Sequence, residues 1–385
     1  MNKTTLILAV LLTATCCGKQ PANPGRTENL IKDSEGDKAE VLLKGGDISV
    51  LTLVEQKGGK YYLDGKENDC VKILASQGFN IVRLRLYNDP GNPSYDPSKQ
   101  MYAGIEDEAD ILNLAKRAKA EGLQIELTFH YSDYWTNGGT QVKPHDWSSL
   151  SYADLKTAVY DYTKAFLQKM VAQKTTPEYV SLGNEIQGGL LYPDGSMDNP
   201  QKTAELFSAG AKAVREICPD AKIVIHLDDA GNVDKYKWFF GEMKKNNLDY
   251  DIIGASYYPF WTNKNVAQLT AWANVIGPLF GKKILIMETG YAWNETLPSG
   301  WKGQIQHNGP YNDMTKAGQK AFMEELFTAI ASSDWMIGDL YWDPIFIPAG
   351  DAGWIPGGPN VVSNTALFDF EGNALEVFDA YKKQY

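Results

Sequence analysis

The chain has 385 residues, of which 22% are charged and 12% aromatic, a composition typical of a globular protein with a large core. Its formal net charge of −11 argues against nucleic acid as a partner, because proteins that bind nucleic acid present clustered lysine and arginine to the phosphates. The length suits two average domains, but a single α/β barrel also uses such a length.

Residues 1–17 have the pattern of a bacterial signal peptide. Lys3 provides a positive start, residues 6–12 form an apolar run, and small residues precede Cys16 and Cys17. The run is too short to span a bilayer in the mature protein. Cysteines directly after small residues resemble a lipoprotein signal, with an ordinary cleaved signal as the alternative. We therefore expect an exported protein that contacts a membrane only through a lipid anchor on one of these cysteines, at the cell envelope or surface.

Residues 18–40 are polar and rich in proline, glycine and charge, which is typical of a flexible tether. Residues 41–385 contain no second linker and are predicted to form one catalytic domain, which we expect to be a monomer. Only Cys70 and Cys218 remain in this part of the chain. Two isolated cysteines predict buried free thiols and not a disulfide framework.

From residue 44 onward, strand-like and helix-like segments alternate, which is the pattern of an α/β fold. Amphipathic stretches such as 106–122, 155–173 and 201–217 separate nearly continuous apolar strands, and this favours a closed (β/α)8 TIM barrel. A doubly wound sheet would more often show a glycine-rich phosphate turn after its first strand, whereas Gly45 and Gly46 precede it. The eight predicted strands are residues 48–53, 80–87, 124–130, 179–184, 222–227, 252–257, 283–288 and 338–342.

Three loops that follow predicted strands are long, at residues 131–147, 291–311 and 343–364. Loops of this length in a compact domain are usually functional, and in a barrel they would line the face that carries the chemistry. We therefore expect a cleft there. Tryptophan rings in these and neighbouring segments are candidates for stacking on sugar faces, with loop packing as the alternative, at Trp135, Trp261, Trp293, Trp301 and Trp354.

Two glutamates stand at the ends of predicted strands. Glu185 directly follows residues 179–184, and Glu288 ends residues 283–288. A carboxyl group at the carboxyl end of a barrel strand points into the active-site mouth, and cleavage of a glycosidic bond requires two of them. The pair predicts a glycoside hydrolase in which Glu185 is the proton donor and Glu288 the nucleophile. An ion pair at the barrel rim is the alternative for either residue alone.

Arginines alternate with apolar residues in one predicted strand. If Leu84 and Leu86 face the helices, Arg83 and Arg85 both face the barrel interior. A buried arginine needs a carboxylate partner, and one close to Glu288 would keep it ionised. We expect Arg85 in this supporting role, with Arg83 as a possible structural ion-pair member.

Other strand-end residues are candidates for substrate contact or support. Asn184 would bond the sugar 2-hydroxyl, a hydroxyl of Tyr257 or Tyr258 would orient the nucleophile, and Trp342 would form an apolar floor for a sugar ring. For His130 and His226, the alternative is a satisfied interior histidine with a purely structural role. Further candidates for the same site are His130, Asp47 and Trp135.

The chain resembles the clan A glycoside hydrolases, and more closely family 53, the endo-β-1,4-galactanases. The similarity runs from about residue 43 to the C-terminus. The Asn-Glu pair is common to the clan, whereas FHYSDYW and ASYYPFW are specific to the family. The matching segments are GGDIS (45–49), NIVRLRLY (80–87), FHYSDYW (129–135), SLGNE (181–185), ASYYPFW (255–261) and MET (287–289).

This resemblance implies a retaining enzyme that cuts β-1,4-linked galactose in type I arabinogalactan, the galactan side chains of pectin. It assigns the proton donor to Glu185 and the nucleophile to Glu288, and it requires no cofactor. Some bacterial relatives hold a structural calcium in the loop after the seventh strand. Residues 301–308 of that loop contain no carboxylate, and calcium prefers carboxylate oxygens, so the sequence does not favour a calcium site.

Three other functions are compatible with a barrel of this kind. A metal-dependent hydrolase is disfavoured because none of the four histidines forms a metal-binding pattern. A non-catalytic glycan-binding lipoprotein is disfavoured because both glutamates are present. A clan A enzyme acting on mannan or cellulose would use the same chemistry, and the sequence does not place the contacts that distinguish the sugars.

Overall fold

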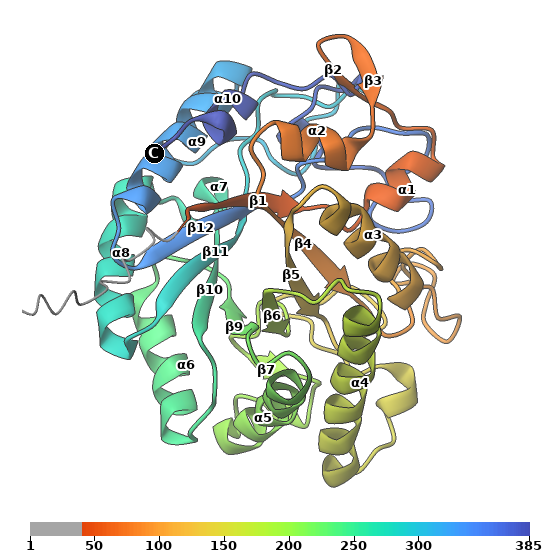
Figure 1. Cartoon of the computed structure of the whole chain (residues 1–385), viewed down its shortest axis with the longest axis vertical. Coiled ribbons are helices and arrows are strands. Elements are labelled where there is room, and N and C mark those ends of the chain that lie inside the picture. Colours follow the sequence, from red (N-terminus) through yellow and green to blue (C-terminus); the bar gives the residue numbers. More distant parts are fainter. Residues whose placement is uncertain (1–40) are drawn as a thin grey trace, which may run out of the picture. The chain divides into compact units, whose positions relative to one another are not determined.

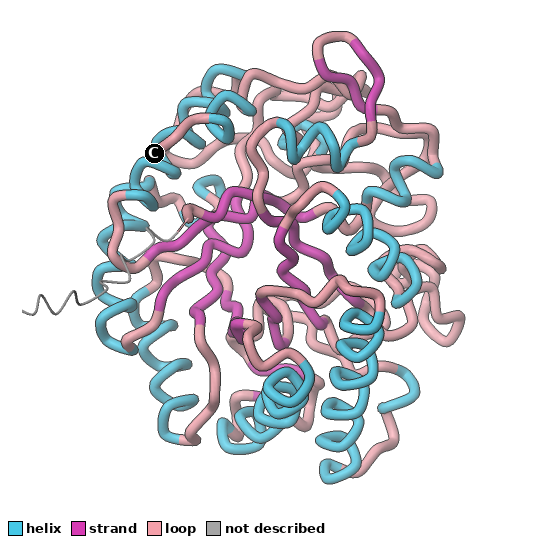
Figure 2. Tube along the Cα trace, in the orientation of Figure 1, coloured by secondary structure: helices cyan, strands magenta, loops and turns pink. Residues whose placement is uncertain are grey.

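The computed structural model describes residues 41–385, and the predicted signal peptide and tether lie outside the described residues. Val41–Tyr385 form one compact unit. Eight parallel strands close into a barrel in the order β1-β12-β11-β10-β9-β6-β5-β4, and the helices surround it (Figures 1 and 2). The prediction of a (β/α)8 TIM barrel is therefore confirmed. The barrel strands are β1 (Leu43–Asp47), β4 (Ile81–Leu86), β5 (Gln124–Phe129), β6 (Tyr179–Leu182), β9 (Lys222–Leu227), β10 (Ile252–Tyr257), β11 (Lys283–Thr289) and β12 (Met336–Tyr341).

The longer helices on the outside of the barrel begin where a polar side chain caps the first turn. Ser151 before α4 accepts a hydrogen bond from the Asp154 N–H, and Asn265 before α8 forms a capping box with Gln268. The helices are α1 (Leu51–Gln56), α2 (Cys70–Ser76), α3 (Glu108–Ala120), α4 (Tyr152–Ala172), α5 (Pro200–Ile217), α6 (Val233–Lys245), α7 (Pro259–Thr262), α8 (Val266–Phe280), α9 (Lys316–Ala331) and α10 (Phe378–Lys382).

Two short hairpins decorate the barrel, β2–β3 (Tyr61–Leu63 and Lys66–Asn68) and β7–β8 (Gly189–Leu190 and Gly195–Ser196). Cys70 and Cys218 are buried free thiols. Within residues 41–385, no helix combines the length and apolar character that crossing a bilayer would need.

The prediction for the first strand is wrong. Seven predicted strands agree with the structure to within two residues at either end, but β1 is Leu43–Asp47, and the predicted strand overlaps α1. The reason is steric. A Cβ atom on Gly45 would lie 2.0 Å from the carbonyl oxygen of Ile81 on the adjacent strand, so β1 needs glycine for close approach. The glycine pair, which was placed before the predicted strand, is part of the barrel.

Side chains alternate between the two faces of each barrel strand. On β4, Val82, Leu84 and Leu86 pack in the core between the strands and the helices, while Arg83 and Arg85 lie on the opposite, interior face. A separate apolar cluster that fills the barrel below the arginines comprises Leu43, Ile81, Val224, Ile252, Leu285, Met287, Ile337 and Leu340. The two arginines therefore lie on the carboxyl side of this apolar cluster.

Substitution of Gly45 by alanine should test the close approach of β1 to β4. We expect Gly45→Ala to lower the free energy of unfolding by roughly 2 kcal/mol or more, because overpacking forces the backbone to shift. Gly241→Ala is the matched control: its Cβ would meet no atom within 4 Å, and alanine favours the helix α6 by roughly 0.5–1 kcal/mol. Urea unfolding curves measure both, and equal effects of the two substitutions would contradict this account.

Candidate active site

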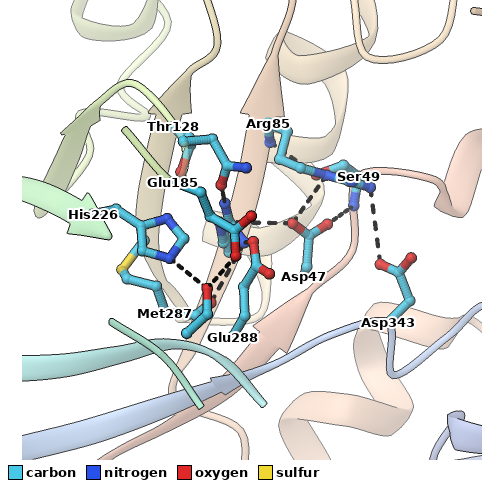
Figure 3. A network of polar contacts seen from close by, with 12 residues as sticks. Asp47, Ser49, Arg85, Thr128, Glu185, His226, Met287, Glu288 and Asp343 are labelled. Carbon is cyan, nitrogen blue, oxygen red and sulfur yellow. Dashed lines mark hydrogen bonds and ion pairs between the residues drawn. The ribbon is translucent and has the colours of Figure 1, made fainter. Parts of the chain in front are cut away.

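Glu185 and Glu288 face each other at the carboxyl ends of β6 and β11 (Figure 3). One carboxylate oxygen of each lies within 4.8 Å of the other. Glu185 adopts a left-handed backbone with φ of 49°, which is uncommon outside glycine and is found preferentially at functional sites. The next residue, Ile186, anchors this turn, since its N–H donates to the carbonyl oxygen of His226 at 2.9 Å. The fold thus brings together two carboxyl groups that are far apart in sequence.

Glu288 is held by two side chains. Arg83 donates from Nη1 to Oε1 at 2.7 Å, and the Tyr258 hydroxyl donates to Oε2 at 2.9 Å. The same guanidinium donates from Nη2 to Asn184 Oδ1 at 2.6 Å and from Nε to Thr128 Oγ1 at 3.2 Å. One buried cation therefore ties the nucleophile candidate to the residue that precedes the acid candidate. The arginine beside Glu288 is Arg83, and not Arg85 as the sequence had led us to expect.

Arg85 and Asp47 form a separate ion-pair cluster. Arg85 Nε lies 3.1 Å from Asp47 Oδ2, and its Nη2 lies 3.0 Å from Glu106 Oε1. Its guanidinium carbon lies 5.2 Å from the ring centre of Trp135, so the cation supports that ring. Asp47 is fully buried, which contradicts its predicted contact with the substrate. The predicted role of Arg85 changes from supporting the nucleophile to supporting an aromatic wall.

The Glu185 carboxyl is adapted to hold a proton. Its removal from water inside the barrel, and then the negative charge of Glu288, raise its pKa to about 8. A hydrogen bond from Ser256 Oγ to Oε1 at 2.8 Å opposes this rise but does not cancel it. Glu185 therefore remains protonated at neutral pH while it still lines the cleft.

Asn184 is fixed by three contacts. Its Oδ1 accepts from Arg83, its Nδ2 donates to the carbonyl oxygen of Thr136 at 3.0 Å, and its own carbonyl accepts from Gln141 Nε2 at 2.8 Å. The amide nitrogen has two hydrogens and only one is used by Thr136. One donor is thus left for a ligand.

A cleft of about 770 Å³ runs past the two glutamates. On one side, the ring centres of Trp135, Trp342 and Trp354 lie 5.7–6.1 Å from one another. Trp261 lines the cleft as well, 54% exposed, with its ring against Tyr258 at 4.7 Å. Flat aromatic surfaces beside two carboxylates suit a chain of sugar rings.

Four further expected residues also lie outside the cleft lining. Tyr257 donates its hydroxyl to the carbonyl oxygen of Lys264, and His130 is buried with Nδ1 2.7 Å from Thr136 Oγ1. Trp293 packs against Phe370, and Trp301 is exposed outside the residues that line the cleft.

Sequence reasoning missed Ser256, Gln141, Gln187 and Asp228, which contact or surround Glu185 and Asn184. For Ser256 a signal was present. Strand alternation puts Ser256 and Tyr258 on one face and Tyr257 on the other, so it separates the two tyrosines and adds the serine to the site. Gln141, Gln187 and Asp228 lie in loops, where no such periodicity exists.

The ligand atoms that could share a metal ion lie in the centre of the site. Among residues 41–385, the group of histidine and carboxylate atoms close enough to share an ion is Glu185, His226 and Glu288, in the centre of the site. His226 Nε2 is already 2.9 Å from Ser256 Oγ. The loop that carries His307 contributes nothing to this group.

Comparison with known proteins adds three findings. The family model described as glycosyl hydrolase family 53 matches residues 43–381. An endo-β-1,4-galactanase of Bacillus subtilis (strain 168) is 30% identical, with 93% of this chain and 89% of the relative aligned. A probable arabinogalactan endo-β-1,4-galactanase A of Aspergillus terreus is 34% identical, with 80% and 86% aligned.

Solved structures agree with this result. The catalytic domain of a family 53 protein of Ignisphaera aggregans superimposes with a TM-score of 0.84 and 33% identity, covering 90% of this chain and 97% of that one. A fungal β-1,4-galactanase superimposes with a TM-score of 0.77 and 26% identity, covering 89% and 100%.

Proposed function

Because this chain belongs to glycosyl hydrolase family 53, we propose that it cuts β-1,4-galactosidic bonds inside galactan chains such as those of type I arabinogalactan. The observation that carries the proposal is the pair Glu185 and Glu288, within 4.8 Å of each other in a cleft lined by tryptophans. The galactanases of Bacillus subtilis and Aspergillus terreus, similar over most of the chain, point to galactan as the polymer.

The spacing of the carboxylates supports a retaining mechanism. Retaining enzymes hold their two carboxyl groups about 5–5.5 Å apart, whereas inverting enzymes leave about 6.5–9.5 Å for a water molecule. Glu288 attacks the anomeric carbon while Glu185 gives its proton to the glycosidic oxygen, and the leaving chain departs with a free hydroxyl. Glu185, now a carboxylate, then takes a proton from the water that attacks the same carbon and releases Glu288 from the ester.

The surrounding side chains have distinct roles in this proposal. Arg83 and Tyr258 orient the Glu288 carboxylate, because both donate hydrogen bonds to it. Asn184 offers its remaining amide hydrogen to the 2-hydroxyl of the sugar being attacked. Trp342 and Trp135 provide apolar surface for sugar rings on one side of the scissile bond. Side chains supply every step of this reaction, so the proposal requires no metal or other cofactor.

We also propose that the protein is exported as a monomer and anchored by a lipid on Cys16 or Cys17. Support comes from the sequence of the first 17 residues. A polymer such as galactan is too large to enter a cell intact, so an enzyme that cuts it inside the chain acts outside the cytoplasm.

Substrate and catalytic residues can be tested together by reducing-sugar release from pectic galactan, mannan, xylan and mixed β-glucans. We expect release from galactan, undiminished by EDTA. Glu288→Gln should reduce kcat/KM by more than about 10⁴-fold, the scale found when a catalytic nucleophile is removed. Glu185→Gln should reduce it by roughly 10²–10⁴-fold, as for general acids. Cleavage of another glycan instead would discard galactan, and no cleavage of any would discard hydrolysis.

The pH dependence should report the proton on Glu185. Since the free enzyme must start with Glu185 protonated, kcat/KM on galactan should fall as the pH rises through about 8. In Glu185→Gln the residual activity should no longer fall there. Rates measured between about pH 4 and about pH 10 test this expectation, because that range runs from the ordinary carboxyl pKa to above the pKa of Glu185. A basic limb that survives in Glu185→Gln would assign the acid to another residue.

The anchor can be tested in a bacterial host by partition of the full chain between detergent and aqueous phases. We expect the wild-type protein in the detergent phase and the double variant Cys16→Ser/Cys17→Ser in the aqueous phase, because one acyl-modified residue provides the membrane affinity. Recovery of the wild type from the aqueous phase would favour an ordinary cleaved signal peptide.

A further inference from the structure

Three side chains from neighbouring strands form a line of hydrogen bonds that ends on Glu185. His226 on β9 has Nε2 2.9 Å from Ser256 Oγ, and Ser256 on β10 donates to Glu185 Oε1 at 2.8 Å. The carbonyl oxygen of His226 also accepts from Ile186, so the histidine holds the Glu185 turn by main chain and side chain alike. Figure 3 shows the His226 ring and the Glu185 carboxyl directed toward one another.

The His226 ring is neutral, so only one of its two ring nitrogens carries a hydrogen. Burial and the nearby charge of Arg83 hold its pKa well below the usual value, so only one ring nitrogen carries hydrogen. Nδ1 is buried and has no hydrogen-bond partner among the described residues, whereas Nε2 faces Ser256. A buried donor without an acceptor is costly, so the proton belongs on Nε2.

A proton on His226 Nε2 fixes the donor and the acceptor in each hydrogen bond from His226 through Ser256 to Glu185. If His226 donates to Ser256 Oγ, the single hydroxyl proton of Ser256 is free to point only at Glu185 Oε1. Oε1 then accepts a hydrogen bond whether Glu185 is ionised or not. The acidic proton is left with Oε2, which has no hydrogen-bond partner within residues 41–385 and belongs to a side chain that lines the cleft.

We propose that His226 is a positioning residue which, through Ser256, confines the proton of Glu185 to Oε2, the oxygen that meets the glycosidic bond. The inference rests on the proposed role of Glu185 as the acid. The same Oε2 then gives the proton to the leaving oxygen and takes one from water in the second step, without reorientation of the carboxyl.

Other charged groups act on Glu185 but do not select between its oxygens. Glu288 on β11 and Asp228, which follows β9, raise its pKa by repulsion, and Arg83 on β4 lowers it. Each acts through space on the carboxyl as a whole. Ser256 is the described partner that touches one oxygen.

The test compares two substrates that differ in their need for an acid. Galactan has a sugar hydroxyl as leaving group and needs protonation, whereas a dinitrophenyl β-galactobioside does not. We expect Ser256→Ala and His226→Phe to lower kcat/KM on galactan by about tenfold or more and on the aryl glycoside by less than about threefold. His226→Gln, whose amide nitrogen can replace Nε2 as a donor, should recover most of the loss.

Ser208→Ala on α5, a serine-to-alanine change away from the cleft, is the matched control and should change neither rate. Equal losses on both substrates would show a structural role only and overturn the proposal, as would no loss on galactan. If the wild type cuts a different glycan, the galactan assignment fails and the comparison is made on that glycan.

A second measurement needs no turnover. In histidine-¹⁵N-labelled protein, nitrogen NMR distinguishes protonated from bare ring nitrogens, and His226→Gln identifies the resonances of His226 among the four histidines. We expect a protonated Nε2 and a bare Nδ1 throughout the neutral range. A proton on Nδ1 would overturn the proposal even in an enzyme that degrades galactan as proposed.

Discussion

The buried charge of Arg83 is the interaction on which the site depends. Its side chain is fully excluded from solvent, and it donates to Glu288, Asn184 and Thr128 at once. A buried cation is tolerated only when its donors are satisfied, so each acceptor must stay where it is. These acceptors lie on β11, directly after β6 and on β5, so one rigid planar group ties Glu288 to Asn184, the residue that precedes Glu185.

Several buried carboxyl groups lie near Arg83 and the neighbouring Arg85 inside the barrel. Arg83 also lies 3.6 Å from Glu126, and Arg85 pairs with Asp47 and Glu106 further toward the aromatic wall. Buried carboxyls outnumber the two guanidinium groups here, and burial raises the pKa of Glu106 and of Glu126 to about 7. Protons retained on such groups limit the net charge of the interior.

Much of the fold and the meeting of Glu185 and Glu288 at one end of the barrel could be predicted, because apolar runs and strand-end carboxyls depend on local sequence. The failures have different physical origins. β1 was missed because its glycines, which permit close contact between strands, interrupt the apolar pattern by which the other strands were recognised. Strand alternation placed both arginines inside the barrel, but it does not say how far along the barrel axis each of them lies. Arg83 and Arg85 were therefore interchanged relative to Glu288. Tyr257 was included although alternation already directed it toward the helices.

The aromatic wall of the cleft is made by two loops that are distant in sequence. Trp135 comes from the loop after β5 and Trp354 from the loop after β12, and their rings are stacked 6.1 Å apart, with Trp342 against both. Neither loop alone presents a continuous surface. An insertion in one loop would leave its partner's ring unsupported, so these loops are constrained to diversify as a pair. Transplanting a new sugar specificity into this barrel would therefore require exchanging both segments together.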